Sequence, residues 1–371
     1  MLIDEFSSFE NNYLFEKKYD DFSYWVYSRY AIFSYLTKLQ EGIEMSSQKM
    51  TDGLICGIKN MIINSLRYRH KIKKIGHRDL LILNHERRVL KDGYYRCIYT
   101  EQIEEHYPNS VMLERPYFYK HLKPIQTERI FYSDCVELES LIYGFLECKL
   151  KAKKYRKAKK FFEKEMSIVA PEFQHMVKQE VSVEALSEML TRLYLLYCVK
   201  RKKFEKIIQK IQPKVILEVV SYNLDCMIFN EIAYEKKINT IELQHGVMSG
   251  SIAYYYPQNV LVKQFPQKIF LFSDYWKNCI SAPLEDKNVI SVGYPYFEEQ
   301  VKKYQKINSD KNKTTKVILF LSQWTIGENF SKFAVEFNNL INGKWKIIYK
   351  LHPGEYTNCL LYTSPSPRDT R

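Results

Sequence analysis

The chain is poor in the glycine motifs that form phosphate-binding loops. It has only 12 glycines in 371 residues, and neither the Walker pattern G-x-x-x-x-G-K-[ST] nor the dinucleotide pattern G-x-G-x-x-G occurs. Because those motifs place backbone amides around phosphate groups, their absence argues against P-loop ATP hydrolysis and conventional NAD binding. We therefore expect no bound cofactor.

Familiar metal-binding patterns are also missing. The sequence contains no H-E-x-x-H, no C-x-x-C pair, and no D-x-D after a predicted strand. These spacings commonly supply the ligands of zinc or of a divalent ion beside a phosphorylated substrate. We expect no metal site and a reaction that needs no metal ion.

Long apolar runs are absent too. No stretch of about 18 uncharged apolar residues occurs, which is the length that a membrane-spanning helix needs. The opening Met1-Leu2-Ile3-Asp4-Glu5-Phe6 has neither the basic nor the apolar region of a signal peptide. We expect a protein with no signal peptide and no membrane span.

The last residues have a composition unlike the rest. Residues 359–371 contain Ser-Pro-Ser-Pro-Arg-Asp and resemble the conceptual translation of a transposase sequencing adapter. We expect residues 359–371 to be an artefact of this kind, with the natural chain interrupted after Asn358.

Composition predicts a folded, basic, cytoplasmic protein. Hydrophobic residues make up 46% of the chain and aromatics 15%, and removing the tail's two arginines and one aspartate lowers the net charge only from +13 to +12. Excluding Cys359 leaves seven of the eight cysteines, several within apolar runs. An odd number without close pairs is typical of reduced thiols in the cytoplasm.

The first half of the chain predicts helices followed by the start of a parallel sheet. In residues 1–75 an apolar stripe, Val26, Tyr30, Phe33 and Leu36, follows helical spacing and indicates a core-facing helix. Three apolar runs then predict buried parallel strands, because strands covered on both faces lose polar alternation. These runs are residues 79–84, 95–99 and 129–132.

A helical insertion is predicted at about residues 136–212. Its segment Lys149 to Lys160 has eight Lys or Arg in twelve residues. Such a run is typical of a solvated helix face, and the alternative is a docking surface for an anionic membrane or a polyanionic glycan. No recognition motif accompanies the charge, so we expect no specific nucleic acid partner.

Strand and helix patterns alternate again from Pro213. Strands are predicted at 214–220, 240–243, 268–272 and 289–292, with a helix at 224–237. The polar segment 302–315 predicts a linker, after which strands 316–321 and 346–350 flank a helix at 329–341. The expected fold class is α/β, with two Rossmann-like domains at 76–301 and 316–358, the second truncated.

Two histidines follow predicted strands, one in each expected domain. His245 lies in Gln244-His245-Gly246 and His352 in Lys350-Leu351-His352-Pro353-Gly354-Glu355. Ligands of open parallel sheets bind beyond the carboxyl ends of strands, so both side chains are candidates for a cleft between domains. A histidine has a pKa suited to accepting a proton from a hydroxyl, and donors at strand ends suit phosphate.

Neighbouring residues complete the candidate site. We predict that Gly246 lets a substrate approach the backbone, and that Pro353 fixes the loop of His352. Lys350 is a candidate phosphate contact, and Glu355 a candidate base or ribose contact. Further candidates at strand ends are Ser221, Tyr222, Ser322, Gln323, His85, Arg87 and Arg88.

These motifs resemble those of bacterial capsule and surface polysaccharide biosynthesis proteins. The likeness rests on Gln244-His245-Gly246, Tyr256-Pro257, Ser273-Asp274-Tyr275-Trp276, Gly293-Tyr294-Pro295 and His352-Pro353. Such proteins are GT-B-type transferases, similar in their Gln-His-Gly and His-Pro motifs to Kdo transferases, sialyltransferases and CDP-glycerol glycerophosphotransferases. The likeness is good over residues 213–355 and loose before them, and the acidic base motif of sialyltransferases has no counterpart.

The resemblance implies that His352 and Pro353 contact the phosphate of a nucleotide donor, often a cytidine nucleotide, and that His245 lies in the cleft. We accordingly expect a membrane-peripheral glycosyltransferase that uses a nucleotide-activated sugar and a glycan or lipid-linked glycan acceptor. One alternative is transfer of a polyol phosphate from a CDP-alcohol. Another is a non-catalytic assembly protein that docks on a membrane.

Overall fold

The computed structural model describes residues 1–42, 51–85, 88–116, 120–308, 316–323, 326–341 and 345–351. The chain divides into two compact units, Met1–Tyr296 and Phe297–Arg371. Each unit is an α/β structure with its own sheet.

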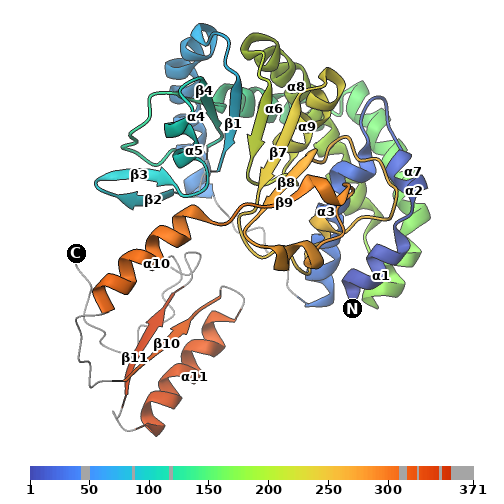
Figure 1. The fold of residues 1–371 in the computed structure, drawn as a ribbon. Helices are drawn as coiled ribbons and strands as arrows, with labels where there is room; N and C mark the ends of the chain where they lie inside the picture. Colours follow the sequence, from blue (N-terminus) through green and yellow to red (C-terminus); the bar gives the residue numbers. More distant parts are fainter. Residues whose placement is uncertain are drawn as a thin grey trace. The chain divides into compact units, whose positions relative to one another are not determined.

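A seven-stranded sheet forms the centre of the first unit (Figure 1), and all its neighbouring strands are parallel. The strand order is β5-β4-β1-β6-β7-β8-β9. The strands are β1 (Leu80–Asn84), β4 (Ser110–Glu114), β5 (Ile130–Tyr132), β6 (Val215–Glu218), β7 (Asn239–Leu243), β8 (Lys268–Leu271) and β9 (Val289–Ser291). Strands β1, β4 and β5 are buried along their whole length, as expected of a parallel sheet covered on both faces.

Helices cover both faces of this sheet. Because successive side chains in a strand point to opposite faces, Leu80 and Ile82 pack with Tyr68 of α4 (Thr51–Lys74), whereas Leu81 and Leu83 join the larger core. Helix α5 (Glu101–His106) contributes Ile103 to the smaller core. The larger core includes side chains of α8 (Val183–Ile211) and α9 (Leu224–Lys236).

The predicted helical insertion consists of α6 (Asp134–Lys149), α7 (Lys153–Val177) and α8, which together connect β5 to β6. Helix α8 packs against α6, α7 and α9. Phe162, Phe173 and Phe204 on these helices are fully buried, so the insertion supplies a large part of the main core.

The N-terminal helices are α1 (Leu2–Phe9), α2 (Asn12–Glu16) and α3 (Tyr24–Gln40). Phe6 and Trp25 stack on Phe173 of α7, so these helices close the outer side of the main core. In the predicted stripe of α3, Val26 and Leu36 are buried, Phe33 is half-buried and Tyr30 is exposed. Arg29 forms a buried ion pair with Glu10, and its guanidinium also donates hydrogen bonds to two backbone carbonyls of the segment that follows β7.

The structure differs from the sequence prediction at three strands. Residues 95–99 were expected in the parallel sheet, but β3 (Tyr94–Cys97) instead pairs antiparallel with β2 (Arg88–Lys91). The turn between them, Asp92-Gly93, has positive φ at both residues, as a two-residue hairpin requires. The neighbour of β1 on that side of the sheet is β4, which the sequence analysis did not identify.

Short 3-10 helices complete the first unit: η1 (Ile252–Tyr254), η2 (Asp274–Cys279) and η3 (Asp286–Asn288). The second unit begins within α10 (Pro295–Asn308) and contains the parallel pair β10 (Val317–Leu321) and β11 (Lys346–Lys350), with α11 (Gly327–Leu340) between them in sequence. The predicted linker at 302–315 is helical up to Asn308, and residues 309–315 lie outside the described ranges.

Candidate functional site

The order of strands reverses between β1 and β6. From β1 the chain proceeds outward to β4 and β5, and it then returns to place β6 on the other side of β1. In open parallel sheets a ligand crevice forms at such a switch point, beyond the carboxyl ends of the strands. A cavity of about 30 Å³ lies there, with His85, Arg115, Ser133, Asn223 and Asp225 among its lining residues. It has room for about one water molecule.

The turn after β7 presents His245 at the same edge of the sheet. Gln244 is buried; its Oε1 accepts a hydrogen bond from the backbone N of Phe272 at 2.8 Å, and its Nε2 donates to the carbonyl of Gly246 at 2.9 Å. Both bonds hold the turn in place. His245 itself is half-buried, so its imidazole is held on a fixed backbone yet partly accessible.

Aromatic side chains from three other segments surround His245. The hydroxyl of Tyr222 lies 3.4 Å from His245 Nε2, and the ring of His85 stacks on the imidazole with centroids 6.1 Å apart. Tyr99 donates from its hydroxyl to the carbonyl of His245 at 2.8 Å. Tyr30 of α3 packs on Tyr222 with ring centroids 4.6 Å apart. The structure therefore brings together His85, Tyr222 and His245, three residues predicted from separate strand ends.

Two glutamates lie buried beneath this group. Glu218 of β6 and Glu242 of β7 are paired in register on neighbouring strands, and both are fully buried. Glu242 accepts hydrogen bonds from the backbone N of Ser221 at 3.1 Å and from the hydroxyl of Tyr254 at 2.7 Å. Ser221 is therefore held by its backbone, and within the described ranges its buried hydroxyl has no hydrogen-bond partner.

The environment of the two carboxyl groups disfavours their charged forms. Burial, followed by the charge of Glu242, raises the pKa of Glu218 to about 8. Burial raises the pKa of Glu242 to about 7, opposed by its bonds from Tyr254 and Ser221. Neither group reaches solvent, so we assign them to supporting the site and not to contacting a substrate.

The residues predicted to cluster at 85–88 do not share one location in the structure. His85 lies at the site, and Arg87 is outside the described residues. Arg88 is buried with its guanidinium between Glu101 and Glu114, and it also donates to the carbonyl of Tyr95 at 3.0 Å. These contacts tie the hairpin β2–β3 to α5 and β4, so Arg88 serves the fold and does not face the crevice.

The second unit carries the predicted donor-side residues at the end of β10 and β11. Ser322 is buried, its backbone N donates to the carbonyl of Lys350 at 2.9 Å, and its hydroxyl accepts from Tyr349 at 2.9 Å. Gln323 and Lys350 are exposed. The remaining predicted residues of this side, His352, Pro353 and Glu355, lie outside the described residues.

Sequence reasoning missed three residues near the candidate site, of which Arg115 lines the cavity at the switch point. Arg115 follows β4, and it was missed because that strand was not predicted; the apolar run Val111-Met112-Leu113 was the available signal. Tyr99 and Tyr294 stack on each other with centroids 5.9 Å apart, and Tyr294 also stacks on Phe272. Gly293-Tyr294-Pro295 was noted as a motif, but nothing in its pattern indicated this contact.

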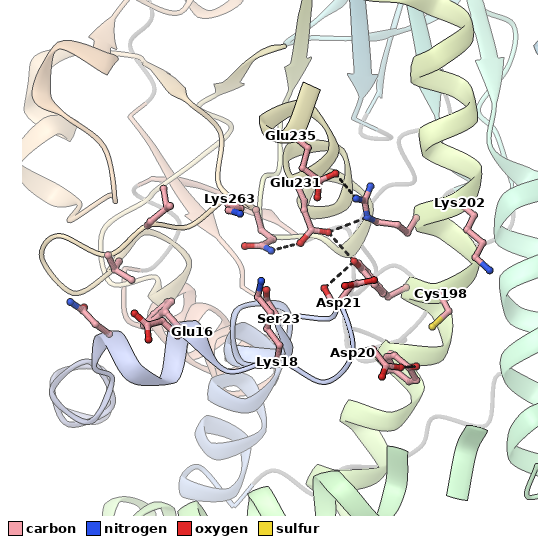
Figure 2. A pocket seen from close by; sticks show the side chains of 18 of the residues that line it. Glu16, Lys18, Asp20, Asp21, Ser23, Cys198, Lys202, Glu231, Glu235 and Lys263 are labelled. Carbon is pink, nitrogen blue, oxygen red and sulfur yellow. Dashed lines mark hydrogen bonds and ion pairs between the residues drawn. The ribbon is translucent and has the colours of Figure 1, made fainter. Parts of the chain in front are cut away.

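A much larger cavity of the first unit lies elsewhere. It has a volume of about 850 Å³, and none of the predicted site residues lines it (Figure 2). Its lining includes Glu235 near the end of α9 and Lys263 before β8, which places it towards the amino ends of the strands. One wall is fixed by Glu231, which accepts hydrogen bonds from Tyr197 at 3.0 Å and Gln264 at 2.6 Å.

Within the described residues, no group of three or more His, Cys, Asp and Glu side chains is arranged to hold a metal ion. Comparison of the chain with protein-family models, curated proteins and solved structures finds no match.

Proposed function

We propose that this protein is a glycosyltransferase of the GT-B type, which moves a sugar from a nucleotide-activated donor to a glycan acceptor. The observation that carries the proposal is the grouping of His245, Tyr222 and His85 at the carboxyl edge of the sheet, beside its switch point. This edge is where open α/β sheets bind their ligands.

In the proposed reaction, an acceptor hydroxyl binds beside His245. Its oxygen attacks the anomeric carbon of the donor sugar while the bond from that carbon to the phosphate oxygen breaks. The hydroxyl proton passes to the His245 imidazole, and the nucleotide leaves with its phosphate. Tyr222, whose hydroxyl lies near Nε2, orients the imidazole. A partly accessible histidine on a fixed turn suits this role.

The donor side of the proposal rests on the second unit. Ser322, Gln323 and Lys350 lie where β10 and β11 end, and His352, Pro353 and Glu355 follow directly in sequence. We assign the phosphate of the donor, in the first instance a CMP-sugar, to His352, Pro353 and Lys350, with Glu355 as a second candidate base. Backbone amides and cations at strand ends are the usual partners of such a phosphate.

We place the protein in the cytoplasm at the inner face of the membrane, where a lipid-linked glycan would be its acceptor. The described cysteines Cys97, Cys135, Cys148, Cys198, Cys226 and Cys279 are all free, in keeping with a reducing compartment. Separately, within the described residues no helix combines the length and apolar character needed to cross a bilayer.

The test is nucleotide release and product mass for the chain incubated with CMP-, UDP- and GDP-sugars and glycan acceptors. His245→Ala should lower kcat by about 100-fold or more, the usual contribution of a general base, with an unchanged melting temperature. Ser249→Ala, at an exposed position of the same loop, is the matched control. Equal turnover by the wild type and His245→Ala would remove the mechanism. A product that has gained phosphorus would instead identify polyol-phosphate transfer.

A further inference from the structure

Two neighbouring helices of the first unit expose apolar side chains to solvent. Helix α6 packs against α4, and Asn64 of α4 donates to Asp134 of α6 at 3.1 Å. On α6 and its end the exposed apolar residues are Leu141, Ile142, Phe145, Leu146 and Leu150. On α4 they are Ile58, Ile62, Ile63 and Leu66. We call these nine side chains the α4–α6 apolar surface.

Their spacing shows that each set occupies one face of its helix. The steps of one, three and four residues between successive positions keep them on one side of a helix with 3.6 residues per turn. Phe145 is 61% exposed and Leu150 is 72% exposed, which is unusual for side chains of this size when they recur along one face. Large apolar side chains that recur along one exposed helix face indicate a surface that a membrane or another molecule covers.

Positive charge borders the α4–α6 apolar surface. Lys149 lies at the end of α6 with its Nζ 5.5 Å from the centre of the Phe145 ring. The exposed cations Lys151, Lys153, Arg156, Lys157 and Lys160 follow, and no acidic residue interrupts the segment from Lys149 to Lys160. An apolar helix face flanked by lysines matches the boundary between acyl chains and anionic headgroups of a bilayer.

A polar cavity adjoins the apolar residues of α4. It has a volume of about 330 Å³, and Ile63 of the apolar surface is part of its lining. The cavity is also lined by Asn60, Asn64, Arg67, Lys120 and Lys123. His121 completes the lining. Lys123 also donates to the hydroxyl of Tyr68, and Asn64 to Asp134. Arg67 and Lys120 are cations of the kind that bind a phosphate diester, and the position beside Ile63 suits a lipid headgroup whose acyl chains lie against α4.

We propose that the α4–α6 apolar surface docks this protein on a bilayer rich in anionic phospholipid, with a headgroup phosphate in the cavity lined by Arg67, Lys120 and Lys123. The apolar side chains enter the headgroup region, and the cations of residues 149–160 bind the surrounding lipid phosphates. The docking does not depend on the proposed transfer reaction, since none of these residues belongs to the crevice around His245.

The experiment measures binding of the full chain to vesicles of phosphatidylcholine with 30% phosphatidylglycerol, and to phosphatidylcholine alone. We expect binding to the anionic vesicles only, weakened by added salt. Phe145→Ser combined with Leu146→Ser and Leu150→Ser should weaken it at least tenfold. Lys153→Gln combined with Arg156→Gln and Lys157→Gln should weaken it by about fivefold per charge removed, since each cation near an anionic surface contributes about that factor.

The matched control is Leu90→Ser with Leu261→Ser, which removes two equally exposed apolar side chains outside the surface. This variant should bind vesicles as the wild type does. Arg67→Gln with Lys120→Gln should reduce the preference for phosphatidylglycerol while leaving the apolar contact in place. Light scattering of each variant in solution is measured in parallel, and circular dichroism establishes that each is folded.

Three outcomes would overturn the proposal. One is vesicle binding that is equal with and without phosphatidylglycerol, or absent in both. Another is an apolar triple variant that binds vesicles as tightly as the wild type. The third is a loss of a dimer in the triple variant without any change in vesicle binding, which would assign the surface to a second copy of the chain. None of these outcomes depends on nucleotide release, so docking and transfer are tested separately.

Discussion

The three residues of Gln244-His245-Gly246 have different structural roles in the turn after β7. Gln244 is buried, and its side-chain amide hydrogen-bonds to the backbone of Phe272 and Gly246, so it holds the turn in shape. His245 places its Nε2 3.4 Å from the hydroxyl of Tyr222. Gly246 is not required by packing, because a Cβ built on it would meet no atom within 4 Å. Gln244 therefore holds the turn on which the His245 ring is carried.

Gly246→Ala is therefore expected to leave the fold unchanged and to test whether a substrate approaches this backbone. The added methyl group meets no protein atom, so the melting temperature should change by less than about 2 °C. If the acceptor passes over Gly246, as the sequence analysis predicts, KM for the acceptor should rise at least fivefold. The same KM in both proteins would show that no substrate lies within reach of this position.

Arg88 was predicted as a site residue, but its contacts show that it stabilises the fold instead. Its guanidinium is buried between Glu101 and Glu114, and desolvation and these carboxylates act in opposite directions on its pKa, with a net rise. Arg88→Met leaves two buried carboxylates without their partner. We expect a loss of about 3–5 kcal/mol in the free energy of unfolding, measured by urea denaturation. Lys91→Met, on the same hairpin and more exposed, should change it by less than about 1 kcal/mol.

At the scale of the element, the regular alternation of apolar runs and helical stripes was enough to predict most strands. Strands β6, β7 and β8 begin and end within two residues of the predicted ranges, because buried parallel strands are short apolar runs with polar ends. The prediction that residues 95–99 join the parallel sheet was wrong for a physical reason. Four apolar or aromatic residues fit either a parallel strand or a hairpin, and the turn Asp92-Gly93 was the deciding signal that the prediction did not use.

The candidate site was predictable only in part. The strand-end positions of His85, Tyr222 and His245 follow from sequence because parallel strands all end at one edge of the sheet. The contacts among them depend on the strand order, which the sequence did not specify. Arg88 shows the limit most clearly: its two carboxylate partners lie on α5 and β4, and no local pattern connects them to it.

The pair Glu218 and Glu242 on strands β6 and β7 makes stability depend on pH. Both pKa values lie above the ordinary value of 4.5, at about 8 and about 7. The folded protein therefore binds more protons than the unfolded chain between about pH 4.5 and pH 8. These two groups therefore lower the free energy of unfolding as pH rises through that range. Glu137, whose pKa burial raises to about 7, contributes in the same direction.

Glu218→Gln should flatten this dependence, because the amide has nearly the shape of the protonated carboxyl group and cannot ionise. We expect the variant to lose less stability than the wild type between pH 6 and pH 9 in thermal melts. Glu180→Gln, at an exposed position, should follow the wild-type curve. A wild-type melting temperature that is constant or rises over this range would show that ionisation of these carboxyl groups does not lower the stability of the folded protein.

At the scale of the whole molecule, each unit has a core of its own. Both hydrophobic cores around the seven-stranded sheet are built from residues of the first unit. In the second unit Phe320 is buried against Phe330, Phe333, Phe337 and Tyr349. Separate cores imply that the first unit does not need the second in order to fold.

A chain that ends at Asn308 is therefore expected to fold. It keeps the whole seven-stranded sheet and the side chains around His245, so its main thermal transition should lie within about 2 °C of that of the full chain. Its vesicle binding should also persist, since α4 and α6 belong to the first unit. Transfer should be lost, because Ser322, Gln323 and Lys350 are removed. Aggregation, or a transition lowered by more than about 5 °C, would instead mean that the second unit stabilises the first. Transfer that survives the cut would place the donor site within the first unit.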